Sequence, residues 1–137
     1  MMADKLTSEP SIIKQFMQEI TDGWTEIDGN PMIEVRALAE HGQANVARFS
    51  LDWMDDAADH AQAMNDAGRN VYMCVNPVDG DANIQAGRGA TDTDILASFY
   101  CFADADTDGA MQNILSFAGP QFTMSVKTGT VPFTRGH

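Results

Sequence analysis

The sequence predicts a mixed α/β fold, with helices and strands alternating along one chain of 137 residues. Near the N-terminus, apolar residues recur at the three- and four-residue intervals of an amphipathic helix. In Met32–Glu40 they alternate with other residues, which is the period of a half-buried strand. Later in the chain, the short apolar runs 71–75 and 95–103 are typical of buried strands. Because the chain has the length of one ordinary domain, these elements are expected to share one core.

The first expected helix begins near Pro10. Its buried stripe has the spacing i, i+3, i+4, i+7 and consists of Ile13, Phe16, Met17 and Ile20. Thr7 or Ser8 is the candidate N-cap, because its hydroxyl can accept a backbone N–H of the first turn. Gly23 is the expected stop.

Two strands are expected next, in 32–40 and 44–51. The alternating apolar positions of the first are Ile33, Val35, Ala37 and Ala39. His41 and Gly42 interrupt the pattern, so a turn is predicted between the two strands.

A second helix is expected after Ser50, the candidate cap, and should end at Gly68. Asp52, Asp55 and Asp56 fall in its first turns, where carboxylates suit the positive end of the helix dipole. The predicted buried stripe consists of Trp53, Ala57, Ala61 and Met64. Trp24 is also expected in the core, beside the first helix.

The second half of the chain predicts a strand, helix, strand unit. The buried strand 95–103 is followed by helically spaced apolar residues between Asp108 and Gly119, and 122–126 is the returning strand. The organisation expected is therefore one domain, 1–137, with an N-terminal α/β portion in 1–69 and a motif-bearing portion in 70–137.

Composition narrows the possible functions. The net charge of −12, with only eight Lys and Arg, argues against a broad nucleic-acid-binding surface. No stretch approaches the length of a membrane span or resembles an export signal, so a soluble, cytoplasmic protein without membrane partners is expected. Cys74 and Cys101 lie in apolar runs, which favours reduced, buried thiols.

The stretch FADADTDG places three carboxylates at alternating positions, Asp104, Asp106 and Asp108, followed by Gly109. This is the opening of a calcium-binding loop. However, an EF-hand requires a bidentate Glu at its twelfth position, where this chain has Leu115. A phosphatase motif of the form DxDx(T/V) is disfavoured, because it requires Thr or Val at the position where this chain has Asp108.

A third interpretation uses the strand itself. Side chains at i and i+2 project to one face about 6.6 Å apart, so Asp104 and Asp106 can share one or two cations at the end of strand 95–103. Paired divalent metals at such a site serve phosphoryl transfer. Asp108 would then only cap the helix that follows.

Four segments together resemble the archaeo-eukaryotic primase superfamily, specifically the primase-polymerase domains of phage and plasmid replication proteins. They are VYMCVNP, GRGATDTDI, FYCFADADTDG and SVKTGTVPFTRGH. The resemblance covers about half of the chain, from Asn70 to His137, in both order and spacing. It implies that this chain is an incomplete primase-polymerase catalytic core, because the family's third metal-binding carboxylate would fall beyond His137.

The resemblance also implies functional residues. Asp104 and Asp106 match the metal-binding motif, for Mg²⁺ or Mn²⁺, and His137 matches the histidine that meets the phosphates of the incoming nucleotide. Arg88, Lys127 and Arg135 are the candidate contacts for the triphosphate or the template. The implied activity is template-directed nucleotidyl transfer in DNA replication, with nucleoside triphosphates, single-stranded DNA and a helicase domain or protein as partners.

Other classes remain open from the residues alone. A calcium-stabilised, non-catalytic binding module would use Asp104, Asp106 and Asp108 together. A plain acidic structural domain would have no specific metal affinity. A metal-dependent glycosyltransferase also places a DxD pair after a strand, but it leaves the segment ending at His137 without a role.

Overall fold

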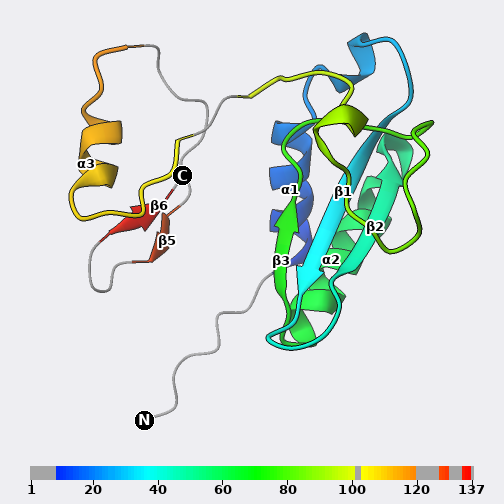
Figure 1. Ribbon diagram of the computed structural model, residues 1–137, viewed down its shortest axis with the longest axis horizontal. Coiled ribbons are helices and arrows are strands. Elements are labelled where there is room, and N and C mark those ends of the chain that lie inside the picture. Colours follow the sequence, from blue (N-terminus) through cyan, green and yellow to red (C-terminus); the bar gives the residue numbers. More distant parts are fainter. Residues whose placement is uncertain (1–8, 101–102, 120–126, 130–133, 137) are drawn as a thin grey trace. The chain divides into compact units, whose positions relative to one another are not determined.

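The computed structural model describes residues 9–100, 103–119, 127–129 and 134–136 (Figure 1). The chain forms two compact units, Met1–Phe99 and Tyr100–His137. Helices and small antiparallel sheets are both present, which confirms the prediction of a mixed α/β chain. In the described part of the chain, no helix has the length and apolar character required to cross a membrane.

The first helix, α1 (Pro10–Ile20), confirms the N-terminal prediction. Proline occupies its first turn, where the missing N–H has no intrahelical partner to lose. Its N-cap is Glu9, which makes no side-chain capping bond; Thr7 and Ser8, the predicted caps, lie outside the described residues. Gly23 has a φ of 83° and starts the 3₁₀ turn η1 (Trp24–Glu26).

The sheet of the first unit is built around β1 (Pro31–Leu38). The strand β2 (Asn45–Ser50) pairs with it in an antiparallel hairpin, as the sequence predicts. On the other edge of β1 lie β3 (Asn70–Met73) at one end and β4 (Val78–Asp79) at the other, both antiparallel. The order β2-β1-β3 makes β1 the central strand.

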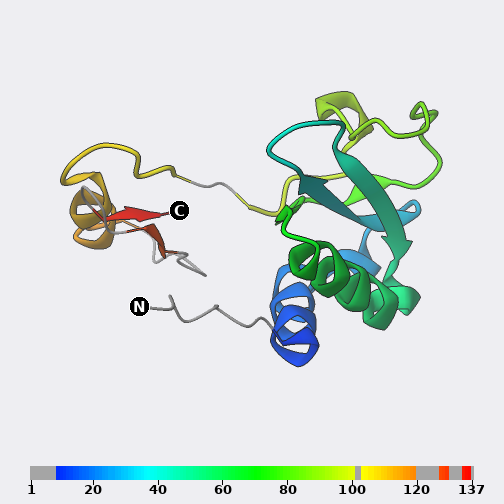
Figure 2. The same cartoon turned by 90° about the horizontal axis from the view of Figure 1, so that it is seen from below.

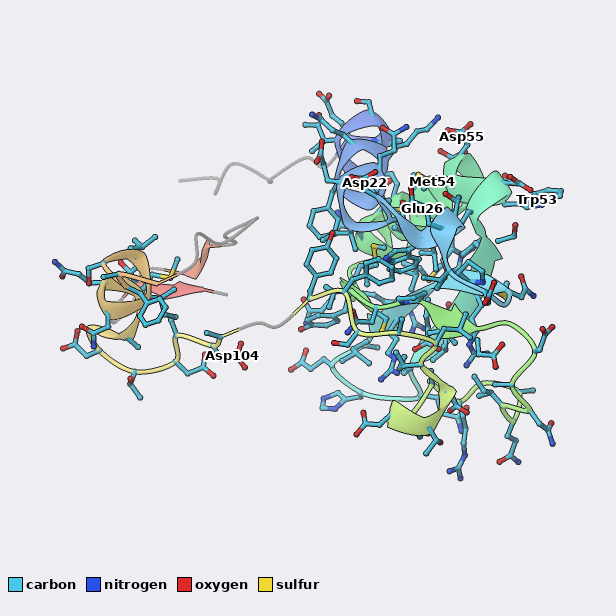
Figure 3. The ribbon with its side chains drawn as sticks, turned by 90° about the horizontal axis from the view of Figure 1, so that it is seen from above. Asp22, Glu26, Trp53, Met54, Asp55 and Asp104 are labelled. Atoms are coloured by element: carbon cyan, nitrogen blue, oxygen red, sulfur yellow. The ribbon has the colours of Figure 1, made fainter. Side chains whose placement is uncertain are left out.

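The second helix, α2 (Met54–Asp66), is one turn later than Ser50 would suggest. Ser50 instead caps the 3₁₀ turn η2 (Leu51–Trp53), accepting the N–H of Asp52 at 3.3 Å. This offset explains a wrong prediction: Trp53 precedes the helix, is rotated off its buried stripe and is 62% exposed. Figure 3 shows it extending from the start of α2 beside Asp55. The residues of α2 that are buried are Ala57, Ala58 and Ala61.

The core of the first unit lies between the sheet and the two helices. Figure 2 shows α1 and α2 on one face of the sheet and the loop after β4 on the other. The buried apolar residues of β1 are Ile33, Val35 and Ala37. Trp24, which is completely buried, confirms its predicted core position and lies 6.4 Å from the ring of Phe99, centroid to centroid.

The predicted buried strand 95–103 is wrong over the described residues. Ile95 makes only an isolated bridge with Val78, and the chain through Tyr100 forms no strand. Apolar character indicates burial, but a strand also needs a neighbouring backbone to bond with. The strand that Ile95 bridges, β4, is only two residues long, so it offers no further backbone for the pairing to continue.

The second unit contains the helix α3 (Ala110–Leu115) and the strands β5 (Lys127–Gly129) and β6 (Arg135–Gly136). The helix confirms its prediction in type but is shorter than the expected span. The predicted strand 122–126 lies outside the described residues. Cys74, in the first unit, is a free thiol of intermediate burial, and Cys101 is outside the described part.

Candidate functional site

The DxD segment of the second unit is extended around Ala105. Ala105 is fully buried, whereas Asp104 and Asp106 on either side of it are exposed. Because successive side chains of an extended chain point in opposite directions, the two carboxylates lie on the same, solvent-facing side. Figure 3 shows Asp104 at the start of this stretch. Two carboxylates in this relation are suitable oxygen ligands for a hard divalent cation such as Mg²⁺.

Backbone hydrogen bonds join this segment to β6. The N–H of Ala105 donates to the carbonyl of Gly136 at 2.8 Å, and the N–H of Gly136 donates back to the carbonyl of Ala105 at 3.4 Å. The pair is an antiparallel bridge. Gly136 also lies opposite Lys127 in the pair of β5 and β6. Three segments that the sequence singles out therefore lie side by side in one unit.

The predicted phosphate-binding residues are distributed over both units. The backbone of Arg135 lies in β6, which is bridged to the DxD segment, and the backbone of Lys127 lies in β5, which pairs with β6. His137 lies outside the described residues. Arg88 belongs to the first unit, in the loop between β4 and η3 (Asp92–Asp94).

The structure corrects the capping role expected for Asp108. The N-cap of α3 is Gly109, with a φ of 78°, and no side chain caps that helix. Asp108 is exposed in the turn that precedes it. A left-handed glycine is the feature that calcium loops of the EF-hand type require at their sixth position, which Gly109 occupies when the loop starts at Asp104.

No group of three or more His, Cys, Asp or Glu side chains in the described part of the chain converges as a set of metal ligands.

Arg88 lies in a loop that is fixed to the sheet by side chains of β1 and β2. This loop, Gly87–Thr91, runs over the sheet face opposite the helices (Figure 2). The completely buried carboxylate of Glu34 accepts the Ala90 N–H at 2.9 Å. Arg36 Nη2 donates to the Ala90 carbonyl at 2.8 Å.

Glu34, Arg36 and Arg48 were not expected to belong to any site. The apolar alternation of β1 assigns Glu34 and Arg36 to the polar face of that strand, and such residues are usually solvated. Instead, Glu34 is 0% exposed and accepts bonds from Arg36 Nε at 2.6 Å and Arg48 Nε at 2.9 Å. The signal available in the sequence was a Glu and an Arg two positions apart on one strand face, with a second Arg on the partner strand.

The far end of the loop is held by a capping box. The Asp94 carboxylate accepts the N–H of Thr91 at 2.8 Å and its hydroxyl at 2.9 Å. The hydrogen bond from the Thr91 backbone contributes most to holding the pKa of Asp94 below its ordinary value of 3.8. The bond from the Thr91 hydroxyl and the charge of Arg48 lower the pKa further. The carboxylate is therefore ionised where the loop meets η3.

Comparisons with known proteins give no match. No protein-family model, no curated protein and no solved structure is similar to this chain.

Proposed function

We propose that this chain is part of a primase-polymerase catalytic core that performs template-directed nucleotidyl transfer in phage or plasmid DNA replication. The main support is the bridge between Ala105 and Gly136. It sets the segment that contains Asp104 and Asp106 beside the segment Arg135–Gly136, which precedes His137 in the sequence. These are the two motifs that the sequence resemblance pairs in one site, although they lie far apart along the chain.

In this proposal, Asp104 and Asp106 hold Mg²⁺ or Mn²⁺ on their shared exposed side. The bound metal would lower the pKa of the attacking 3′-hydroxyl and offset the charge of the triphosphate. Lys127, Arg135 and His137 are proposed to contact the phosphates, and Arg88 is proposed as a further contact to the triphosphate or the template. The contribution of these residues is positioning and electrostatic stabilisation, without a covalent intermediate.

The partners proposed with this activity are nucleoside triphosphates, a single-stranded DNA template and a helicase domain or protein. The location proposed is the cytoplasm of a bacterial or phage-infected cell.

A calcium-stabilised binding module is the second candidate, and the left-handed conformation of Gly109 favours it. Against it, the twelfth position of such a loop is Leu115, a residue of α3 that offers no carboxylate. Asp108 distinguishes the two functions, because only the calcium loop uses its side chain as a ligand.

The test is binding of a fluorescent deoxynucleoside triphosphate, followed by anisotropy, with Mn²⁺, Ca²⁺ or a chelator. Manganese-dependent binding that is lost in Asp106→Asn, weakened in His137→Ala and unchanged in Asp108→Asn is the expected result. Asp108→Asn is the matched control because it removes an equally exposed carboxylate two residues away. The absence of nucleotide binding, together with calcium affinity that falls equally in Asp106→Asn and Asp108→Asn, would replace the proposal with the binding module.

A further inference from the structure

The loop Gly87–Thr91 is fixed along its whole length, although it has no regular secondary structure. It starts in a turn in which the Arg88 N–H donates to the Gln85 carbonyl at 3.0 Å. Its centre is held by Glu34 and Arg36, which satisfy both backbone polar groups of Ala90. Loops are commonly among the least stable parts of a fold, whereas this loop is held by the buried Glu34 and the partly exposed Arg36 and Arg48.

The backbone of Arg88 is fixed while its side chain is left available. Arg48 Nη2 donates to the Arg88 carbonyl. Within the residues that the structure describes, the Arg88 guanidinium has no hydrogen bond or ion pair, and the residue is exposed. A guanidinium with a fixed backbone and free donors loses little conformational freedom when it binds a phosphate in a bidentate manner.

The close packing beside Arg88 depends on a glycine. A Cβ built on Gly89 would lie 2.5 Å from Cζ of Arg36, so no larger residue fits there without moving the guanidinium. Arg36 can therefore reach Glu34 and the Ala90 carbonyl together only because position 89 has no side chain.

The charges around the loop favour an anion. Two guanidinium groups share the single carboxylate of Glu34, so this cluster has an excess of positive charge before Arg88 is added. The Asp94 carboxylate lies close enough to Arg48 to offset this one excess charge, so the positive charge that remains at the loop is that of Arg88. In a chain with a net charge of −12, three of the eight basic residues are gathered at this one loop.

We infer that Glu34, Arg36 and Arg48 are positioning residues, which hold the Gly87–Thr91 loop so that Arg88 contacts a phosphate group. The inference rests on the proposed function, because that function supplies the phosphate-bearing ligands. Two sources share this chemistry: the triphosphate of a nucleotide and the backbone of a single-stranded template.

The test is a double-mutant cycle on the 137-residue chain, with fluorescent dTTP plus Mn²⁺ as one probe and labelled oligo-dT in chelator as the other. Arg88→Ala is expected to weaken binding about five- to tenfold, the effect of one exposed charge-assisted hydrogen bond. Arg36→Lys keeps the positive charge, but a lysine cannot donate to both Glu34 and the Ala90 carbonyl as the planar guanidinium does. The loop should then be held less firmly, so binding should weaken by a similar factor. The double variant Arg36→Lys with Arg88→Ala should bind no more weakly than Arg88→Ala alone.

Glu34→Gln gives a second measurement that does not depend on any ligand. Hydrogen exchange of a peptide containing Ala90 should become faster in this variant, because its N–H loses a carboxylate acceptor. Glu40→Gln is the matched control, since Glu40 follows the end of β1 and is exposed. Lys14→Ala controls for the loss of one cation on the helix face, where Lys14 pairs with Asp55.

Several outcomes would overturn the inference: affinity for both probes unchanged by Arg88→Ala, losses that add fully in the double variant, or unchanged exchange in Glu34→Gln. A wild-type chain that binds neither probe would also overturn it. A loss in Arg88→Ala limited to dTTP or to oligo-dT supports the contact and identifies the source of the phosphate. Asp106→Asn separates this inference from the proposed function, because oligo-dT binding in chelator should be unaffected by it.

Discussion

Replacing Glu34 with alanine is expected to destabilise the first unit by about 3 kcal/mol. Breaking a buried ion pair typically costs about 3 to 5 kcal/mol when a charge is left without its partner. Here the two arginines have side chains that are 41% and 21% exposed, so water can solvate part of their charge and the lower end of that range applies. The Ala90 N–H also loses its acceptor, but Ala90 is only partly buried, so water can replace that bond in part and the expected total stays at about 3 kcal/mol.

The measurement is urea unfolding followed by tryptophan emission. Both tryptophans, Trp24 and Trp53, lie in the first unit, and Trp24 is completely buried, so the signal reports this unit alone. With a slope of roughly 1 to 1.5 kcal/mol per molar urea, a loss of about 3 kcal/mol lowers the midpoint by roughly 2 to 3 M. Glu40→Ala, at an exposed position, should change the free energy of unfolding by less than about 0.5 kcal/mol.

The reasoning would be refuted if the urea midpoint of Glu34→Ala differed from that of the wild type by no more than the midpoint of Glu40→Ala does. It would mean that the carboxylate contributes no more to stability than a solvated surface acid does. The loop would then be held by its turn and its capping box alone.

Three further predictions concern other parts of the chain. Gly89→Ala should lower the free energy of unfolding of the first unit by about 1 to 3 kcal/mol, because its Cβ would overlap Arg36; an unchanged urea midpoint would contradict this. Ala105→Leu should accelerate hydrogen exchange in peptides of the second unit, since Ala105 is fully buried at the bridge, whereas exposed Thr107→Leu should not. Asp94 has a lowered pKa, so its stabilising contribution is present above 3.8 and is lost as the pH falls through its folded pKa. Between about pH 5 and about pH 2, wild type should therefore lose more stability than Asp94→Asn; equal losses in urea midpoint would exclude this role.

The sequence predicts well those helices and strands in which the spacing of apolar residues within the element itself shows a helical or strand period. The helix α1 and the hairpin of β1 and β2 follow directly from apolar spacing and from the turn at Gly42. Trp53 was placed wrongly because it lies in the 3₁₀ turn η2 before α2, so the α-helical period that assigned it to the buried stripe does not apply there. Such boundaries are decided by capping competition, which periodicity does not report.

The site was predictable only in part, for a different reason. The DxD pair and the glycine-rich segment before His137 are visible as sequence motifs, and their backbones meet at the bridge between Ala105 and Gly136. The Glu34 cluster is not visible in this way, because its burial depends on a loop more than fifty residues away in sequence. A polar residue on the outer face of a strand is solvated unless some distant segment covers it, and that coverage is a property of the whole fold.

The charge of this chain limits how it can recognise phosphate in the proposed function. With twenty Asp and Glu against eight Lys and Arg, diffuse attraction to a polyanion is not available. Of the eight basic residues, Arg36 and Arg48 pair with Glu34 and bond to the backbone of the loop, so their charges are already engaged within the protein. Asp104 and Asp106 by themselves would repel a triphosphate, and only a bound divalent cation reverses the field there. In the proposed function, nucleotide binding at Asp104 and Asp106 should therefore depend on a divalent metal, whereas a contact through Arg88 needs no metal, so the two can be measured separately.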